Sequence, residues 1–119
     1  VDSYVVAGTT DHITPWKSVY QTARILGDET TFVLSNSGHL QCLLNPPGNP
    51  KASFVSGAAK PADPDGFAAT AEKHAGSWWT HWSGWLSTRS SDKVAAPSEL
   101  GNERFPPREA APGTYVFNA

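Results

Sequence analysis

Two polar residues follow two predicted strands at corresponding places and could form a catalytic acid–base pair. Asp11 lies four residues past the strand-like run 3–7, and His39 lies four residues past a second run at 31–35. Loops at the carboxyl ends of parallel strands converge on one crevice, so we expect the two side chains to lie together. A carboxylate that accepts the imidazole N–H fixes the tautomer and leaves the other ring nitrogen free to take a proton from a nucleophile. The pair therefore predicts nucleophilic catalysis and lacks only the nucleophile.

Cys42 is the only cysteine and follows His39 by three residues, in what reads as a short helical turn. No Gly-x-Cys-x-Gly sequence surrounds it, and a lone cysteine is most often a small buried hydrophobe, so we assign it to packing. In the α/β-hydrolase arrangement the nucleophile precedes the acid and the histidine along the chain. Because the chain has no Met and opens inside a strand-like run at Val1, we expect it to be a fragment whose nucleophile lies upstream.

The other three histidines give weaker signals. His12 follows Asp11 directly, and because adjacent side chains diverge we expect it to be auxiliary or structural. His74 and His81 lie seven residues apart in a predicted helix without a third ligand at matching spacing, so no metal site is predicted. Asp11 and His39 also have simpler interpretations, as a turn carboxylate and a loop histidine, and only their joint placement favours the catalytic one.

A parallel β-α-β unit must position these residues. The runs 3–7 and 31–35 are rich in β-branched and aromatic residues, which is typical of buried strands. Between them, apolar residues at three- and four-residue steps predict a helix over 15–26, with Thr14 as its cap and Gly27 as its stop. The unit predicts an α/β fold, although two strands and one helix cannot cover both faces of the sheet.

The rest of the chain divides into segments that differ in composition and in predicted secondary structure. Residues 45–66 are rich in Pro and Gly and predict an irregular loop. Asp63 then caps a predicted helix that runs to about residue 88 and holds four of the five tryptophans. Residues 90–112 are rich in Ser, Pro and charged residues, and 113–117 predict a last short extended piece.

Composition sets outer limits on function. The chain has 119 residues, which is one small domain at most, and a formal net charge of −2. It offers no broad basic surface for nucleic acid and no run of 18 apolar residues that would predict a transmembrane helix. A single cysteine cannot form an internal disulfide, so a cytoplasmic protein is expected.

Several segments, taken together and in order, resemble the C-terminal third of polyhydroxyalkanoate synthases. The resemblance covers nearly the whole chain and is closest to the medium-chain-length class. The segments that carry it are Ala7-Gly8-Thr9-Thr10-Asp11-His12-Ile13-Thr14-Pro15-Trp16, Phe32-Val33-Leu34-Ser35-Asn36-Ser37-Gly38-His39-Leu40, Asn45-Pro46-Pro47-Gly48-Asn49-Pro50-Lys51, Gly76-Ser77-Trp78-Trp79-Thr80-His81-Trp82 and Ala110-Ala111-Pro112-Gly113-Thr114-Tyr115-Val116.

The resemblance implies that residues 1–119 are the C-terminal part of one α/β-hydrolase-type catalytic domain that polymerises 3-hydroxyacyl-CoA into polyester and releases CoA. Matched by motif, Asp11 and His39 correspond to the family's catalytic aspartate and histidine, and His12 to the histidine after the aspartate. The family's nucleophile is a cysteine in a Gly-x-Cys-x-Gly box, which this chain lacks. His39 would deprotonate that cysteine, and Asp11 would orient His39 or help activate the 3-hydroxyl of the incoming unit.

The resemblance also implies partners and a location. The expected partners are the CoA thioester, the growing polyester, the missing N-terminal part and a second copy of the full-length enzyme. The full-length enzyme would lie in the cytoplasm at the surface of polyester granules and would need no metal or other cofactor. Alone, the chain is expected to be inactive and poorly folded, because a sheet edge and a Trp-rich helix face would lose their cover.

Two other functions remain open from the residues alone. An esterase or polyester depolymerase with serine as nucleophile would use the same Asp11 and His39. A non-enzymatic module could instead bind polyester through the tryptophan face of residues 67–86. The helical spacing of these tryptophans favours packing in a core over such an interface.

Overall fold

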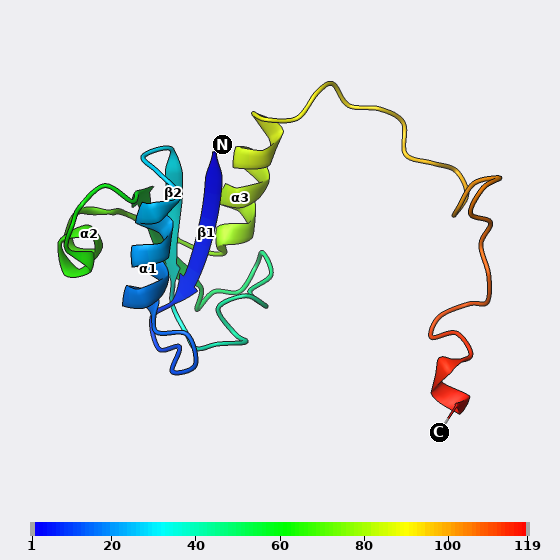
Figure 1. Cartoon of the computed structure of the whole chain (residues 1–119), viewed down its shortest axis with the longest axis horizontal. Helices are drawn as coiled ribbons and strands as arrows, with labels where there is room; N and C mark the ends of the chain where they lie inside the picture. Colours follow the sequence, from blue (N-terminus) through cyan, green and yellow to red (C-terminus); the bar gives the residue numbers. More distant parts are fainter. Residues whose placement is uncertain (1, 119) are drawn as a thin grey trace.

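The structure is a computed structural model that describes residues 2–118. A four-stranded mixed sheet lies at its centre (Figure 1). The strands lie in the order β1-β2-β3-β4, with β1 and β2 parallel and the other neighbouring pairs antiparallel. In chain order the elements are β1 (Ser3–Gly8), α1 (Trp16–Ile25), β2 (Thr30–Ser35), β3 (Ser53–Ala58), α2 (Pro64–Thr70), β4 (Glu72–Ala75), α3 (Trp78–Ser87) and the short 3₁₀ helix η1 (Tyr115–Phe117).

The predicted parallel β-α-β unit is confirmed as β1, α1 and β2, so the fold is α/β as expected. The helix starts one residue later than predicted, and Thr14 does not cap it. Pro15 is the cap residue and makes no side-chain hydrogen bond, while the Thr14 hydroxyl donates to Asp11. The expected cap has thus become part of the loop that carries the candidate acid.

The prediction of an irregular loop over 45–66 is wrong in its middle, where β3 pairs antiparallel with β2. Phe54 and Ser56 are buried and alternate with more exposed neighbours, as in a strand with one covered face. Pro and Gly are concentrated on either side of this strand, in 46–50 and 61–66, so they mark its ends.

The single long helix predicted after Asp63 is also wrong, because the segment divides into α2, β4 and α3. Asp63 caps α2 as expected, accepting hydrogen bonds from the backbone N–H groups of Asp65 and Gly66. Ala71 then turns extended, with ψ 150°. Gly76 ends strand β4 with a φ of +89°, a conformation that costs glycine little. His74 therefore lies on strand β4 and not on a helix.

Helices cover both faces of the sheet (Figure 1). On one face, α1 and α2 enclose an aromatic core in which Tyr20, Phe32 and Phe67 are fully buried with ring centroids 5.0–5.3 Å apart. On the other face, Tyr4 of β1 packs edge-on against Trp85 of α3, with ring centroids 5.4 Å apart. Contacts between such rings stabilise a fold beyond the apolar area that they bury.

The tryptophans of α3 do not form a core within the described chain, contrary to the expectation from their spacing. No residue of α3 is fully buried, and Trp82 is 41% exposed. Trp78 and Trp85 are half-buried against Tyr4. Part of the aromatic surface of α3 is therefore open to solvent.

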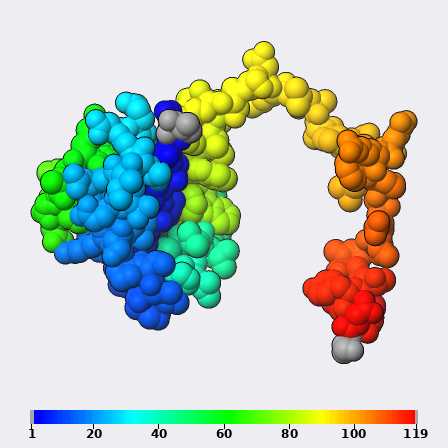
Figure 2. Space-filling model, in the orientation of Figure 1, coloured from blue at the N-terminus to red at the C-terminus, as the bar shows by residue number. Residues whose placement is uncertain are grey.

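Beyond α3 the chain leaves the body of the molecule, and residues 90–118 run outward as an exposed tail (Figures 1 and 2). The extended piece predicted at 113–117 is instead the 3₁₀ helix η1 at the far end of this tail. No helix within residues 2–118 is long and apolar enough to cross a membrane.

Candidate active site

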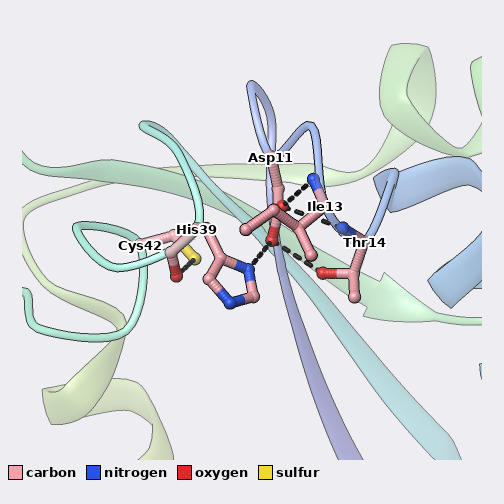
Figure 3. A network of polar contacts seen from close by, with 5 residues as sticks. All are labelled: Asp11, Ile13, Thr14, His39 and Cys42. Carbon is pink, nitrogen blue, oxygen red and sulfur yellow. Dashed lines mark hydrogen bonds and ion pairs between the residues drawn. The ribbon is translucent and has the colours of Figure 1, made fainter.

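The structure brings Asp11 and His39 into direct contact, as their places behind β1 and β2 predict (Figure 3). The imidazole Nδ1 of His39 lies 2.8 Å from Oδ2 of Asp11. The two residues are 28 positions apart in the chain, so only the parallel pairing of the two strands brings them together. Geometry thus supports the pair, while its catalytic role stays a prediction.

The loops that follow β1 and β2 are joined where they leave the sheet. The backbone N–H of Thr10 donates to the carbonyl of Ser37 at 3.2 Å. A Cβ on Gly8 would lie 2.7 Å from the Ser37 carbonyl oxygen and 2.9 Å from Cβ and Sγ of Cys42. Only glycine fits at this position, because the two loops approach so closely there.

Three hydrogen bonds from its own loop fix the carboxylate of Asp11 in addition to the contact with His39 (Figure 3). Oδ1 accepts from the backbone N–H groups of Ile13 and Thr14, both at 2.9 Å, and Oδ2 accepts from the Thr14 hydroxyl at 2.7 Å. The Asp11 side chain is 5% exposed. Burial alone would raise its pKa, but the bonds from Thr14, His39 and Ile13 outweigh it and hold the pKa well below its usual range.

The part played by Thr14 was missed from sequence, where it was assigned to the helix cap. Its spacing carried a signal, because a hydroxyl three residues after an aspartate can close a turn on that carboxylate. The hydroxyl donates to the same Oδ2 that receives His39. Each oxygen of Asp11 therefore accepts two hydrogen bonds, which leaves no room for a proton and requires the carboxylate form.

His39 leaves its second ring nitrogen open. Because the Asp11 carboxylate only accepts hydrogen bonds, Nδ1 carries the proton of the neutral ring and Nε2 presents a lone pair. Within residues 2–118 no hydrogen bond reaches Nε2, and the His39 side chain is 38% exposed. In Figure 3 the ring turns Nδ1 toward Asp11 and Nε2 away from it. This is the arrangement that a general base requires.

Cys42 is placed for packing, as predicted. It is 2% exposed, and its Sγ donates to the backbone carbonyl of His39 at 3.4 Å rather than contacting the imidazole. Burial raises the pKa of the thiol, and the nearby charge of Asp11 raises it further. A buried thiol that holds its proton is a poor nucleophile.

The remaining histidines lie outside the pair. His12 is exposed beside Asp11, without a hydrogen bond among the described residues. His74 and His81 are half-buried with ring centroids 5.5 Å apart, so the fold brings them closer than their predicted places on one helix. A hydroxyl lies 2.8 Å from one ring nitrogen of each. Burial lowers the pKa of His81. Residues 2–118 contain no group of three or more His, Cys, Asp or Glu that could hold a metal ion.

The chain is similar to several poly(3-hydroxyalkanoate) polymerases, although no protein-family model matches it. Polymerase 1 of Ectopseudomonas oleovorans is 55% identical over 115 residues, and polymerase 2 of the same organism is 49% identical over 117. The polymerase subunit PhaC of Cupriavidus necator is 40% identical over 116 residues.

These alignments take in 97–98% of this chain but only 20–21% of each relative. The chain therefore spans about a fifth of the length of the curated relatives that it matches. The similarity is nonetheless too high and too continuous to rest on a shared fold alone. Over nearly its whole length, the chain is therefore similar in sequence to a segment of poly(3-hydroxyalkanoate) polymerases.

Proposed function

We propose that this chain supplies the acid–base pair of a poly(3-hydroxyalkanoate) polymerase, which joins 3-hydroxyacyl units from CoA thioesters into polyester and releases CoA. The observation that carries the proposal is the contact between Asp11 and His39, with Nε2 of the imidazole left open. The names of the relatives support the polymer product. The nucleophile is a cysteine outside residues 1–119, so the chain alone releases no CoA.

In the proposed mechanism, Nε2 of His39 takes the proton of the nucleophilic thiol, and the thiolate attacks the thioester carbonyl. The CoA sulfur leaves and takes that proton back from the imidazolium, and the acyl group stays on the enzyme. His39 then accepts the proton of a 3-hydroxyl group, whose oxygen attacks the acyl-enzyme. The ester bond forms, the C–S bond to the enzyme cysteine breaks, and the released thiolate takes the proton back from the imidazolium. The thioester is already activated for acyl transfer, so no metal or further cofactor is needed.

Asp11 orients His39 and stabilises the imidazolium in this mechanism, rather than activating the 3-hydroxyl directly. Both of its oxygens already accept hydrogen bonds from Ile13, Thr14 and His39, and its side chain is 5% exposed. A hydroxyl of the substrate would have to displace one of these donors. The lowered pKa of Asp11 also makes it a weak base for an alcohol.

The proposal extends to the setting of the whole polymerase. Its product is a water-insoluble polyester, so the enzyme works in the cytoplasm at the surface of the polymer granule. It acts as a homodimer. The two polymerases of Ectopseudomonas oleovorans, with 55% and 49% sequence identity to this chain, are suitable proteins in which to test these properties.

A hybrid enzyme tests the proposal. In it, this chain replaces the matching segment of polymerase 1 of Ectopseudomonas oleovorans, to which it is 55% identical. The measurement is CoA release from 3-hydroxyacyl-CoA, together with analysis of the product. The expected result is polyester and stoichiometric CoA. A folded hybrid that releases CoA but yields only free 3-hydroxy acid would instead indicate a hydrolase, and one that releases no CoA would contradict the proposal.

A further inference from the structure

The first turn of α3 contacts the chain segment that follows His39 through three hydrogen bonds. The indole N–H of Trp78 donates to the carbonyl of Cys42 at 2.7 Å, and that of Trp79 donates to the carbonyl of Leu43 at 2.9 Å. The hydroxyl of Ser77 donates to the carbonyl of Asn45. Three consecutive residues, the cap residue Ser77 and the first two residues of α3, thus bind three nearby carbonyl groups within 42–45.

The start of α3 is itself fixed to the sheet. Ser77 caps the helix by accepting from the backbone N–H of Trp79 at 3.0 Å. The backbone N–H of Gly76 donates to the carbonyl of Ala52 at 2.8 Å, next to the start of β3. Adjacent helical side chains point about 100° apart, yet both indoles donate to neighbouring carbonyl groups of the same turn. The donors therefore stand on a rigid base.

Apart from the contact of His39 with Asp11 and the buried side chain of Cys42, the turn over 38–44 is held by local bonds and by α3. Backbone bonds from Cys42 to Gly38 and from Leu44 to Leu40, both 2.9 Å, close it locally. Its apolar side chains do not anchor it, because Leu40 is 70% exposed and Leu44 is 64% exposed. Only Cys42 is buried. The indole donors are thus main supports of the turn that carries His39.

We propose that Trp78 and Trp79 are positioning residues that keep His39 against Asp11 by holding the carbonyls of its turn. The inference rests on the proposed function, in which His39 is the base. It assigns to the paired tryptophans a task that depends on the indole N–H and not on aromatic bulk. Phenylalanine keeps the ring but has no donor, so it separates the two properties.

The neighbouring tryptophans provide matched controls. The indole nitrogen of Trp85 is buried without a hydrogen-bond partner among the described residues. Trp82 is 41% exposed and packs against Trp78, with ring centroids 6.2 Å apart. Replacing Trp82 by phenylalanine therefore changes an aromatic contact on the same helix without removing a donor to the turn.

The experiment compares Trp78→Phe, Trp79→Phe and Trp82→Phe in the hybrid polymerase. The readouts are kcat, KM and the hydrogen–deuterium exchange of the peptide that covers 38–44. Loss of one neutral hydrogen bond corresponds to about a fivefold change. We expect kcat to fall about fivefold in either Trp78→Phe or Trp79→Phe, with KM within about twofold and faster exchange in the turn. Trp82→Phe should leave the kcat and the exchange unchanged.

The outcomes separate the inference from the proposed function. If His39→Gln abolishes turnover while Trp79→Phe keeps the full kcat and normal exchange, the positioning role is wrong. If His39→Gln leaves turnover intact, the proposed function is wrong, and the exchange of 38–44 still decides whether the indoles hold the turn. Trp78 packs against the rings of Tyr4 and Trp82, whereas Trp79 packs only against Trp78 among the described rings, so Trp79→Phe should fold even if Trp78→Phe does not. A lower melting temperature with unchanged kcat in Trp79→Phe would indicate a merely structural role.

Discussion

Replacing Asp11 by asparagine should disable the acid–base pair while preserving the shape of its loop. In the native chain Oδ1 accepts two backbone N–H groups, from Ile13 and Thr14, and Oδ2 accepts the Thr14 hydroxyl and Nδ1 of His39. An asparagine keeps its carbonyl oxygen at the Oδ1 position, because the two N–H groups there need an acceptor. Its NH₂ group must then face His39.

The consequence is a change of tautomer. An NH₂ group donates, so Nδ1 of His39 becomes the acceptor and the ring proton moves to Nε2. That nitrogen then cannot take a proton from the thiol. Loss of the correct tautomer in a comparable triad lowers kcat by about 10⁴-fold. We expect a fall of about 10³–10⁴-fold in the kcat of the hybrid polymerase, with KM changed far less.

The assay is CoA release by the hybrid, combined with NMR of isotope-labelled histidine to identify the nitrogen of His39 that carries the proton. Asp65→Asn is the matched control, because Asp65 is 66% exposed and, among residues 2–118, forms its surface ion pair with Lys17 alone. It should keep kcat within about twofold. A kcat for Asp11→Asn within tenfold of the unsubstituted hybrid, or a proton still on Nδ1, would refute the reasoning.

The remaining predictions concern packing, the thiol and pH. Gly8→Ala should lower the free energy of unfolding of the hybrid polymerase by about 1–3 kcal/mol in urea denaturation, because its Cβ would lie 2.7 Å from the backbone oxygen of Ser37. Gly84→Ala, in helix α3 with nothing within 4 Å of the added Cβ, should raise it by about 0.5–1 kcal/mol, and equal effects of the two would contradict the close approach of the loops. Cys42→Ser should keep the kcat of the hybrid within about threefold, because the buried thiol donates only to a backbone carbonyl, and loss of turnover in a folded variant would reopen its role as nucleophile. The pKa of Asp11 is lowered in the fold, so the stabilisation it provides is complete above the ordinary carboxyl pKa of about 3.9 and is lost as the pH falls below it. The urea midpoints at about pH 5 and pH 3 should therefore differ more for the unsubstituted hybrid polymerase than for its Asp11→Asn variant, and parallel changes would count against the lowered pKa.

The parallel unit and the candidate pair were predictable because short-range patterns and one general rule were sufficient. The strand-like runs and the helix between them follow from residue type and spacing, and Tyr20 and Ala23 are buried on the expected face of α1. Parallel strands then place Asp11 and His39 at the same sheet edge. Nothing in this inference depended on distant parts of the chain.

The second half of the chain was less predictable because tertiary pairing overrides local period. Apolar residues at helical spacing continue from Phe67 to Trp85, yet Glu72–Ala75 is drawn into the sheet by pairing with β3. The backbone departures that interrupt the helix, at Ala71 and Gly76, are visible only in the structure. The spacing of apolar residues within one segment does not show which distant segment it pairs with.

The support of His39 by α3 could not be predicted from sequence for the same reason. Trp78 and Cys42 are 36 residues apart, and the acceptors are backbone carbonyl groups, which every residue has and which no residue type reveals. The spacing of the tryptophans instead favoured a core. Half-buried indoles that donate hydrogen bonds to a turn show the same helical spacing as residues of a buried core.

The central claim, that His39 is the base of the polymerase, is tested most directly by the rate of CoA release from 3-hydroxyacyl-CoA in the hybrid carrying His39→Gln. His12→Gln is the matched control, because His12 is exposed nearby and makes no hydrogen bond among the described residues. The account predicts that His39→Gln lowers the rate at least about 10³-fold in a folded enzyme and that His12→Gln keeps it within about threefold. Equal rates for the two folded variants would contradict the account.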